Sequence, residues 1–255
     1  MIDVALGLRL WMVASILFMG LSAQLSHAAA LNVDDIQDKG VLVVGVDIPY
    51  GVMEFYDKDG REAGIDIDIS REIARQLGVK VQFVAMPFDQ LFSAIQERRV
   101  DLVSSAVTIT PKRQETLLFS EPYLDAGMSL AVAASNTDIL RLEDLSGKRV
   151  AVLKGTIGEE IATNSPLFAN AEIIDYQANE IRMAELIEGK VDAAIVHFLT
   201  TDDSSIRLVG EPLTLSFYGL VTHLSNRTLI VQINRILRDM KRNNTLRNIK
   251  LKYVE

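Results

Sequence analysis

The 255-residue chain has no cysteine and only three histidines, His27, His197 and His223. Without cysteine there is no disulfide, no thiol nucleophile, no thiolate-bound zinc and no lipid-modified N-terminal cysteine. The histidines are far apart in the sequence, so we expect neither a metal site nor another cofactor. The protein must be stabilised by its hydrophobic core, and 49% apolar residues is an ordinary globular composition.

Basic charge is also scarce. The chain carries 26 Lys and Arg against 34 Asp and Glu, a formal net charge of −8. A nucleic-acid-binding protein is expected to present a basic face, so this composition argues against that class. Net charge does not argue against a small-molecule ligand, because the charges of the groups that line a binding site matter more than the net charge of the chain.

Long apolar runs are absent after residue 30. Before it, Arg9 precedes the run LWMVASILFMGLSAQL, and SHAAA (26–30) offers the small residues that signal peptidase requires. This pattern predicts a secretory signal peptide over residues 1–30, cleaved after Ala28 or Ala30, and a periplasmic mature protein. The alternative is an uncleaved membrane anchor, but the apolar run is short for a segment that spans a bilayer.

Apolar strands and amphipathic helices alternate along the first half of the chain. Strands are predicted at 41–47, 79–86 and 100–109, and helices at 31–40, 68–78 and 87–99. The tetrapeptide DKDG (57–60) predicts a hairpin turn. Strands joined by crossover helices form parallel sheets, so we expect an α/β fold.

The alternation returns in the second half. Strands are predicted at 130–135, 148–155, 171–176 and 191–198, and helices at 141–147, 156–164 and 178–189. Two amphipathic helices, broken at Asn243 and Asn244, end the chain. The chain passes between the two blocks at 119–130 and again at 210–221, which predicts two lobes, a hinge and a cleft that binds a ligand.

Several segments resemble one family. The most specific is TITPKRQETLLFSEPYL (108–124); the others are VLVVGVDIPYGVMEFYDKDGREAGIDIDISREIARQLG (41–78), LEDLSGKRVAVLKGT (142–156) and EGKVDAAI (188–195). Together they resemble periplasmic solute-binding proteins of family 3, which serve polar amino acid ABC transporters. The resemblance covers nearly all of the mature chain.

The resemblance implies the two-lobed type II periplasmic-binding-protein fold. Each lobe would be a mainly parallel sheet flanked by helices, with a hinge between the lobes. We expect the first lobe at 31–125 and 214–255, and the second at 126–213. The implied partners are a small carboxylate ligand and an ABC permease in the inner membrane, and the protein is expected to be a monomer.

The resemblance also implies a ligand site between the lobes. Its expected residues are Asp47, Tyr50, Phe88, Ser105, Thr108, Arg113, Thr156 and His197. Arg113 is the expected clamp for a ligand carboxylate, because a guanidinium offers a rigid pair of donors that matches it. Ser105 and Thr108 would add hydroxyl donors, and Thr156 opens a helix whose free N–H groups favour an anion.

Each of these residues also has a purely structural interpretation. Arg113 can be a surface arginine, and Thr156 only a helix cap. Ser105 and Thr108 can be ordinary strand residues, while Tyr50 and Phe88 can belong to the core. Asp47 can orient a neighbouring loop.

The second lobe departs from the family pattern. Amino-acid-binding members usually have an acidic residue for the ligand's α-ammonium where this chain has His197, and Ile157 stands where a hydroxyl is common. A neutral imidazole is a poor partner for ammonium, and an imidazolium repels it. His197 can also be structural, and Asp202 or Asp203 can replace the acid only if their loop folds back.

Three functions follow from the resemblance. The first is the substrate-binding component of an ABC transporter, not an enzyme, for an amino acid or a carboxylate without an α-amine. The second is a ligand-sensing periplasmic module. The third is an enzyme similar to cyclohexadienyl dehydratase, which needs a general acid in the cleft; residues 193–201 contain no carboxylate, which disfavours it.

Overall fold

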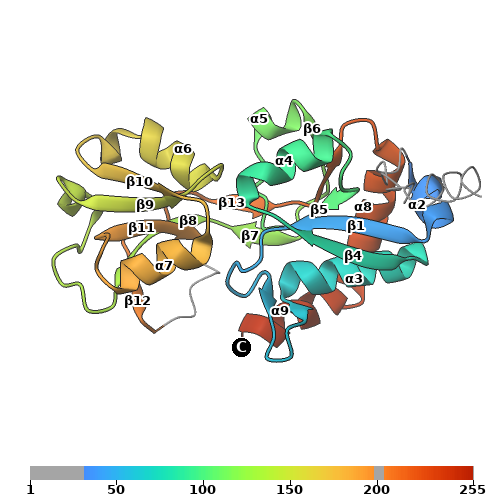
Figure 1. The fold of residues 1–255 in the computed structure, drawn as a ribbon, viewed down its shortest axis with the longest axis horizontal. Coiled ribbons are helices and arrows are strands. Elements are labelled where there is room, and N and C mark those ends of the chain that lie inside the picture. The colour runs from blue at the N-terminus through green and yellow to red at the C-terminus, as the bar shows by residue number, and fades with distance from the viewer. Residues whose placement is uncertain (1–31, 198–203, 255) are drawn as a thin grey trace, which may run out of the picture.

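The structure, a computed structural model, describes residues 32–197 and 204–254. The predicted signal peptide and the pair Asp202 and Asp203 lie outside the described residues. Figure 1 shows two lobes side by side, with β7 (Leu124–Ala126) and β13 (Ser216–Tyr218) between them.

The first lobe is built on a five-stranded sheet in the order β4-β1-β5-β14-β6. Its strands are β1 (Val41–Val46), β4 (Lys80–Ala85), β5 (Leu102–Val103), β6 (Leu117–Phe119) and β14 (Val221–His223). Strand β1 pairs in parallel with β4 and β5, whereas β14 pairs antiparallel with β5 and β6. The crossover helices predicted the parallel pairs, and the antiparallel pairs arise because β14 returns from the far end of the chain.

Helices cover both faces of this sheet. The helices are α2 (Val33–Lys39), α3 (Ile65–Leu77), α4 (Phe88–Gln96) and α5 (Pro111–Gln114), and the hairpin β2 (Phe55–Tyr56) and β3 (Glu62–Ala63) precedes α3. Figure 1 shows α3 and α4 on opposite sides of β1 and β4. Helix α3 begins three residues before the predicted start, with Gly64 as its N-cap at φ 126°. Only glycine fits there, because a Cβ would lie 2.3 Å from the Met53 carbonyl oxygen.

The second lobe repeats the plan with the order β10-β9-β11-β8-β12. Its elements are β8 (Met128–Ala133), the 3-10 helix Leu142–Leu145, β9 (Arg149–Leu153), α6 (Ile157–Asn164), the 3-10 helix Pro166–Phe168, β10 (Glu172–Tyr176), α7 (Asn179–Ile187), β11 (Ala193–His197) and β12 (Ile206–Val209). Strands β9, β10 and β11 are parallel, and β8 pairs antiparallel with β11 and β12. Helices α6 and α7 lie on opposite sides of the sheet (Figure 1).

The connection between the lobes is a short antiparallel ladder. Strand β13 pairs with β7, and Thr108 forms an isolated bridge with Tyr218. The predicted boundaries at 125/126 and 213/214 fall at or next to this ladder, and the exact division stays a prediction.

Two helices complete the first lobe. Helix α8 (Arg227–Arg242) and helix α9 (Thr245–Val254) are separated at Asn243 and Asn244, as predicted. Helix α9 packs against α3, and α8 packs against α2, α3 and β6. The end of the chain therefore belongs structurally with its beginning.

One predicted strand is much shorter than expected. The apolar run at 100–109 predicts a long strand, but only Leu102–Val103 is paired as β5. The chain leaves the sheet at Ser104, and Ala106 adopts a positive φ of 46°. The Asp66 carboxylate accepts the Ala106 N–H at 2.6 Å and holds this turn. The apolar run therefore becomes a buried loop at the edge that faces the second lobe.

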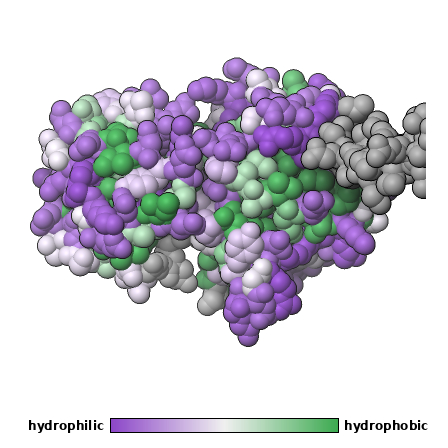
Figure 2. Space-filling view, in the orientation of Figure 1, coloured by the Kyte–Doolittle hydropathy of each residue, from purple (hydrophilic) through white to green (hydrophobic). Residues whose placement is uncertain are grey.

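Each lobe has its own hydrophobic core, and the second lobe has one on each side of its sheet. Figure 2 shows mostly hydrophilic surface, with apolar atoms gathered in the region of β1 and β4. Within the described residues, no helix is long and apolar enough to cross a membrane. The same part of the chain holds no group of three or more acidic or histidine side chains placed to bind a metal.

Candidate functional site

Arg113 bridges the two lobes. It lies in α5, just after the loop that leaves β5. Its guanidinium donates from Nη1 to the Thr108 carbonyl at 2.9 Å and from Nη2 to the Gly155 carbonyl of the second lobe at 3.0 Å. These two donors therefore face the line where the lobes meet.

The same guanidinium lies against aromatic rings. Its central carbon is 4.9 Å from the centroid of Phe92 and 5.7 Å from that of Phe88, both on α4. Such cation–π contacts hold the side chain in place. Burial lowers the pKa of Arg113 to about 10, so it stays protonated at neutral pH. Phe88, predicted as a wall of the site, supports Arg113.

Ser105 is buried at the edge of the first-lobe sheet. Its hydroxyl donates to the Glu54 carboxylate and accepts the Asp47 N–H at 3.2 Å. Thr108 is also buried, and its carbonyl rather than its hydroxyl contacts Arg113. Both residues lie in the loop after β5, and Thr108 is the one that contacts the guanidinium.

Thr156 is the N-cap of α6, at the start of the second lobe's helix. Its hydroxyl accepts the Glu159 N–H at 3.4 Å and donates to the Leu153 carbonyl at 2.6 Å. The Glu159 carboxylate accepts the neighbouring Gly155 N–H at 2.6 Å. The capping role proposed as the alternative is thus present, at a helix start that faces Arg113.

Three buried carboxyl groups lie beneath the cleft in the first lobe. Asp47 follows β1, Glu54 lies in the next loop, and Asp66 is in α3. Desolvation is the main cause that raises all three pKa values: Asp47 to about 7, Asp66 to about 6, and Glu54 well above its usual range. Asp66 accepts hydrogen bonds from the Tyr123 hydroxyl and from Ala106 N–H. These groups hold protons at pH values where ordinary carboxyls are ionised.

Aromatic rings fill the middle of the junction. His197, at the end of β11, lies edge-on to Tyr218 with centroids 4.9 Å apart, and to Tyr50 at 6.0 Å. All three side chains are buried. Desolvation, followed by the charges of Arg182 and Arg113, lowers the pKa of His197 to about 3. The imidazole is therefore neutral at physiological pH.

A second buried arginine faces the first lobe from α7. Arg182 is 2% exposed and donates to the Ile195 carbonyl and to Asn179 Oδ1, each at 2.5 Å. It also interacts with the Tyr50 hydroxyl across the junction. Burial lowers its pKa.

Comparison with known proteins decides the family. Residues 42–255 match the bacterial extracellular solute-binding proteins, family 3. The chain belongs to this family. It is 25% identical over 225 residues to the L-cystine-binding protein TcyJ of Escherichia coli (strain K12), covering 86% of this chain and 84% of the relative.

Solved structures of this solute-binding fold superpose well on the chain. One is the ancestral amino acid-binding protein AncCDT-1, a precursor of cyclohexadienyl dehydratase, with 31% identity and a TM-score of 0.83, covering 88% of this chain and 99% of that one. Another is holo ArgBP from T. maritima, with 30% identity and a TM-score of 0.76, covering 82% and 93%. The predicted type II two-lobed fold is confirmed.

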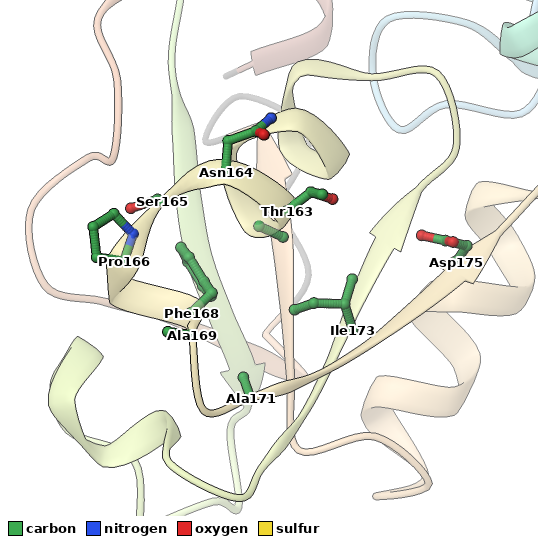
Figure 3. Close-up of a pocket in the computed structure, with 10 residues that line it drawn as sticks. Thr163, Asn164, Ser165, Pro166, Phe168, Ala169, Ala171, Ile173 and Asp175 are labelled. Carbon is green, nitrogen blue, oxygen red and sulfur yellow. The ribbon is translucent and has the colours of Figure 1, made fainter.

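Cavities of this solute-binding protein lie both at and away from the junction. One of about 240 Å³ opens between the lobes beside Asp47, Met86 and Asn179. A larger one, about 510 Å³, is on the second lobe at the end of α6, lined by Asn164, Phe168 and other residues in Figure 3. No Lys or Arg lines the larger cavity, and its residues all belong to one lobe, so it does not share the chemistry of the junction.

The structure brings the eight predicted site residues to one region, the junction of the two lobes. It adds four groups that sequence reasoning missed: Glu54, Asp66, Arg182 and Tyr218. Arg182 carried one available signal, a charged residue in an otherwise apolar stripe of its helix with Leu186. Glu54 and Asp66 had none, because a buried carboxylate looks like a surface one in sequence.

Proposed function

We propose that this protein is the extracytoplasmic, periplasmic substrate-binding component of an ABC transporter. It captures a small carboxylate-bearing solute between its lobes and delivers it, as a monomer, to a permease in the inner membrane. Family membership supports solute binding, and the names of the relatives support an amino acid or a related compound. No catalytic role is proposed for the site.

The observation that carries the proposal is the position of Arg113. Its two terminal nitrogens meet carbonyl oxygens from both lobes, and its charge persists at neutral pH. A ligand carboxylate offers two oxygens that replace these carbonyls and binds the guanidinium more strongly, because both partners are charged. Thr108, whose carbonyl contacts Arg113, and Thr156, next to Gly155, complete the proposed subsite, and Ser105 lies in the same loop as Thr108.

Calorimetry on purified protein, freed of bound solute and titrated with amino acids and organic acids, tests this proposal. Arg113→Met keeps an apolar side chain against Phe88 and Phe92 but removes the charge. We expect it to weaken binding by about 2–5 kcal/mol, the usual loss for one partner of a buried charge pair. Arg99→Met, which removes an exposed arginine paired with Glu97, is the matched control. Unchanged affinity in Arg113→Met would refute the clamp.

One observation favours a second candidate, a dehydratase-like enzyme. Residues 193–201 contain no carboxylate, but Asp47 supplies a carboxyl with a pKa of about 7 on the opposite lobe. Such a group can act as a general acid near neutral pH. Turnover of prephenate or arogenate by the purified protein, lost in Asp47→Asn, would establish this activity; binding without turnover supports the transporter role.

A further inference from the structure

We propose that the cleft takes a small dicarboxylate, with Arg113 binding one carboxylate and Arg182, on the second lobe, binding the other. The inference rests on the proposed function and narrows its ligand class. It makes Arg182, on α7, a specificity-determining residue of the second lobe, in which His197 stands in place of the usual acidic group.

The first support is that the charge of Arg182 has no close ion pair. Among the described residues, no carboxylate oxygen lies within ion-pairing distance of its guanidinium, although Tyr50 and, at longer range, Asp47 attract it. Its hydrogen-bond partners within the second lobe, the Ile195 carbonyl and the Asn179 side chain, are neutral, and its Nε is buried with no partner. A buried cation without a close ion pair is costly, and an anionic ligand is the natural compensation.

The second support is the position of Arg182 in the cleft. Its helix belongs to the second lobe, yet the Tyr50 hydroxyl of the first lobe meets it. Tyr50 in turn contacts His197, whose ring feels the charges of both Arg182 and Arg113. The two guanidiniums therefore flank the same aromatic group, one from each lobe.

The third support is that, within residues 32–197 and 204–254, the end of β11 supplies no acid for the α-ammonium of an amino acid. The residue at the end of β11 is His197, which is neutral and provides no negative charge. Asp47 faces Arg182, but the neighbouring charges of Glu180 and Asp89 and its own burial favour its protonated form. With a pKa of about 7, the Asp47 carboxyl is thus only partly ionised near neutral pH.

The inference separates this chain from relatives such as the arginine-binding protein. A ligand with a cationic side chain would bring a third positive charge to a cleft that already holds two. A dianion neutralises both guanidiniums when the lobes meet. Its two ends would also bind different lobes, so that binding favours closure.

The test compares ligands of matched size by isothermal titration calorimetry. The refolded protein is titrated at pH 7 with glutarate, glutamate, glutamine and arginine. We expect both dicarboxylates to bind at least about tenfold more tightly than glutamine, since a charge-assisted contact is worth ~1.5–3 kcal/mol. Arginine should bind weakest. Glutarate against glutamate shows whether an α-amine is tolerated.

Arg182→Met should lower dicarboxylate affinity by about 10–100-fold and leave glutamine binding within about threefold. Arg207→Met is the matched control, because Arg207 also holds second-lobe carbonyls, those of Asn136 and Ile139. If glutamine or arginine binds wild-type protein as tightly as the diacids, the inference is wrong while the proposed function stands. If no carboxylate binds, both fail. Should Arg182→Met not fold, the wild-type ranking alone decides.

Discussion

At the scale of single residues, Asp47 shows how one carboxyl group connects the fold to the cleft. It follows β1 directly, its N–H donates to the Ser105 hydroxyl, and its Oδ2 is buried without a partner. Burial, Glu180 and Asp89 raise its pKa to about 7, while Arg182 opposes the shift. The folded protein therefore binds a proton here that the unfolded chain releases near pH 4.

This raised pKa predicts a pH-dependent stability. Between about pH 4 and 7 the native state holds more protons than the unfolded state, so stability falls as pH rises through this window and is then level. Asp66, with a pKa of about 6, adds to the same slope. Asp47→Asn removes the ionising group. The change that it causes in the unfolding free energy of the ligand-free protein should be more favourable at pH 8 than at pH 4.5, by on the order of 2 kcal/mol.

Urea unfolding of both proteins at the two pH values measures this difference. Asp138→Asn, at an exposed site in the second lobe, is the control and should show no such change. Equal effects of Asp47→Asn at pH 4.5 and pH 8 would mean that the carboxyl is ionised throughout.

At the scale of secondary-structure elements, the terminal helices decide the stability of the first lobe. Helix α8 buries one face, including Ile233 and Leu237, and exposes Val231. Both α8 and α9 pack on elements from the start of the chain. The first lobe is therefore complete only when the chain has returned from the second.

Truncation of the buried face of α8 should be strongly destabilising. Ile233 is fully buried, so Ile233→Ala leaves a cavity and should cost about 2–5 kcal/mol of unfolding free energy. Val231 is 62% exposed, and Val231→Ala in the same helix should cost less than about 0.5 kcal/mol. Chemical denaturation checks both, and similar losses would contradict the packing of α8.

Amphipathic helices such as α8 and α9 were predictable from the sequence, whereas the candidate site was predictable only in part. The periodicity of 229–254 and the pair Asn243–Asn244 predicted α8 and α9, because apolar spacing reports directly on packing. The prediction of a long strand at 100–109 was wrong, because apolar composition does not reveal that the Asp66 carboxylate holds a turn of the chain at Ala106. Arg113 was predictable from a family motif. The role proposed for Arg182 was not, because it depends on the contact with Tyr50 of the other lobe, which the sequence does not reveal.

At the scale of the whole molecule, the two lobes meet through a short hinge, the buried rings of Tyr50 and His197, and polar contacts such as that of Arg113. Strands β7 and β13 form the ladder between them, and Arg113 reaches Gly155 across the junction. Closure of such a cleft depends on how closely the backbones approach. Gly155 lies close to the first lobe: a Cβ there would lie 3.1 Å from both Cα and Cβ of Asp89.

A methyl group at Gly155 should therefore hinder closure. Gly155→Ala adds a clash between lobes to the strain of a residue with φ 77°, whereas Gly189→Ala has nearly the same φ, 73°, and open space around it. We expect each to cost about 1 kcal/mol of unfolding free energy from backbone strain. Only Gly155→Ala should also weaken ligand binding and reduce the ligand-induced decrease in radius of gyration measured by small-angle X-ray scattering. If both variants match the wild type in ligand affinity and in the decrease in radius of gyration, the lobes do not close through this contact. Backbone strain, which the two variants have in common, would then be the only effect of the added carbon.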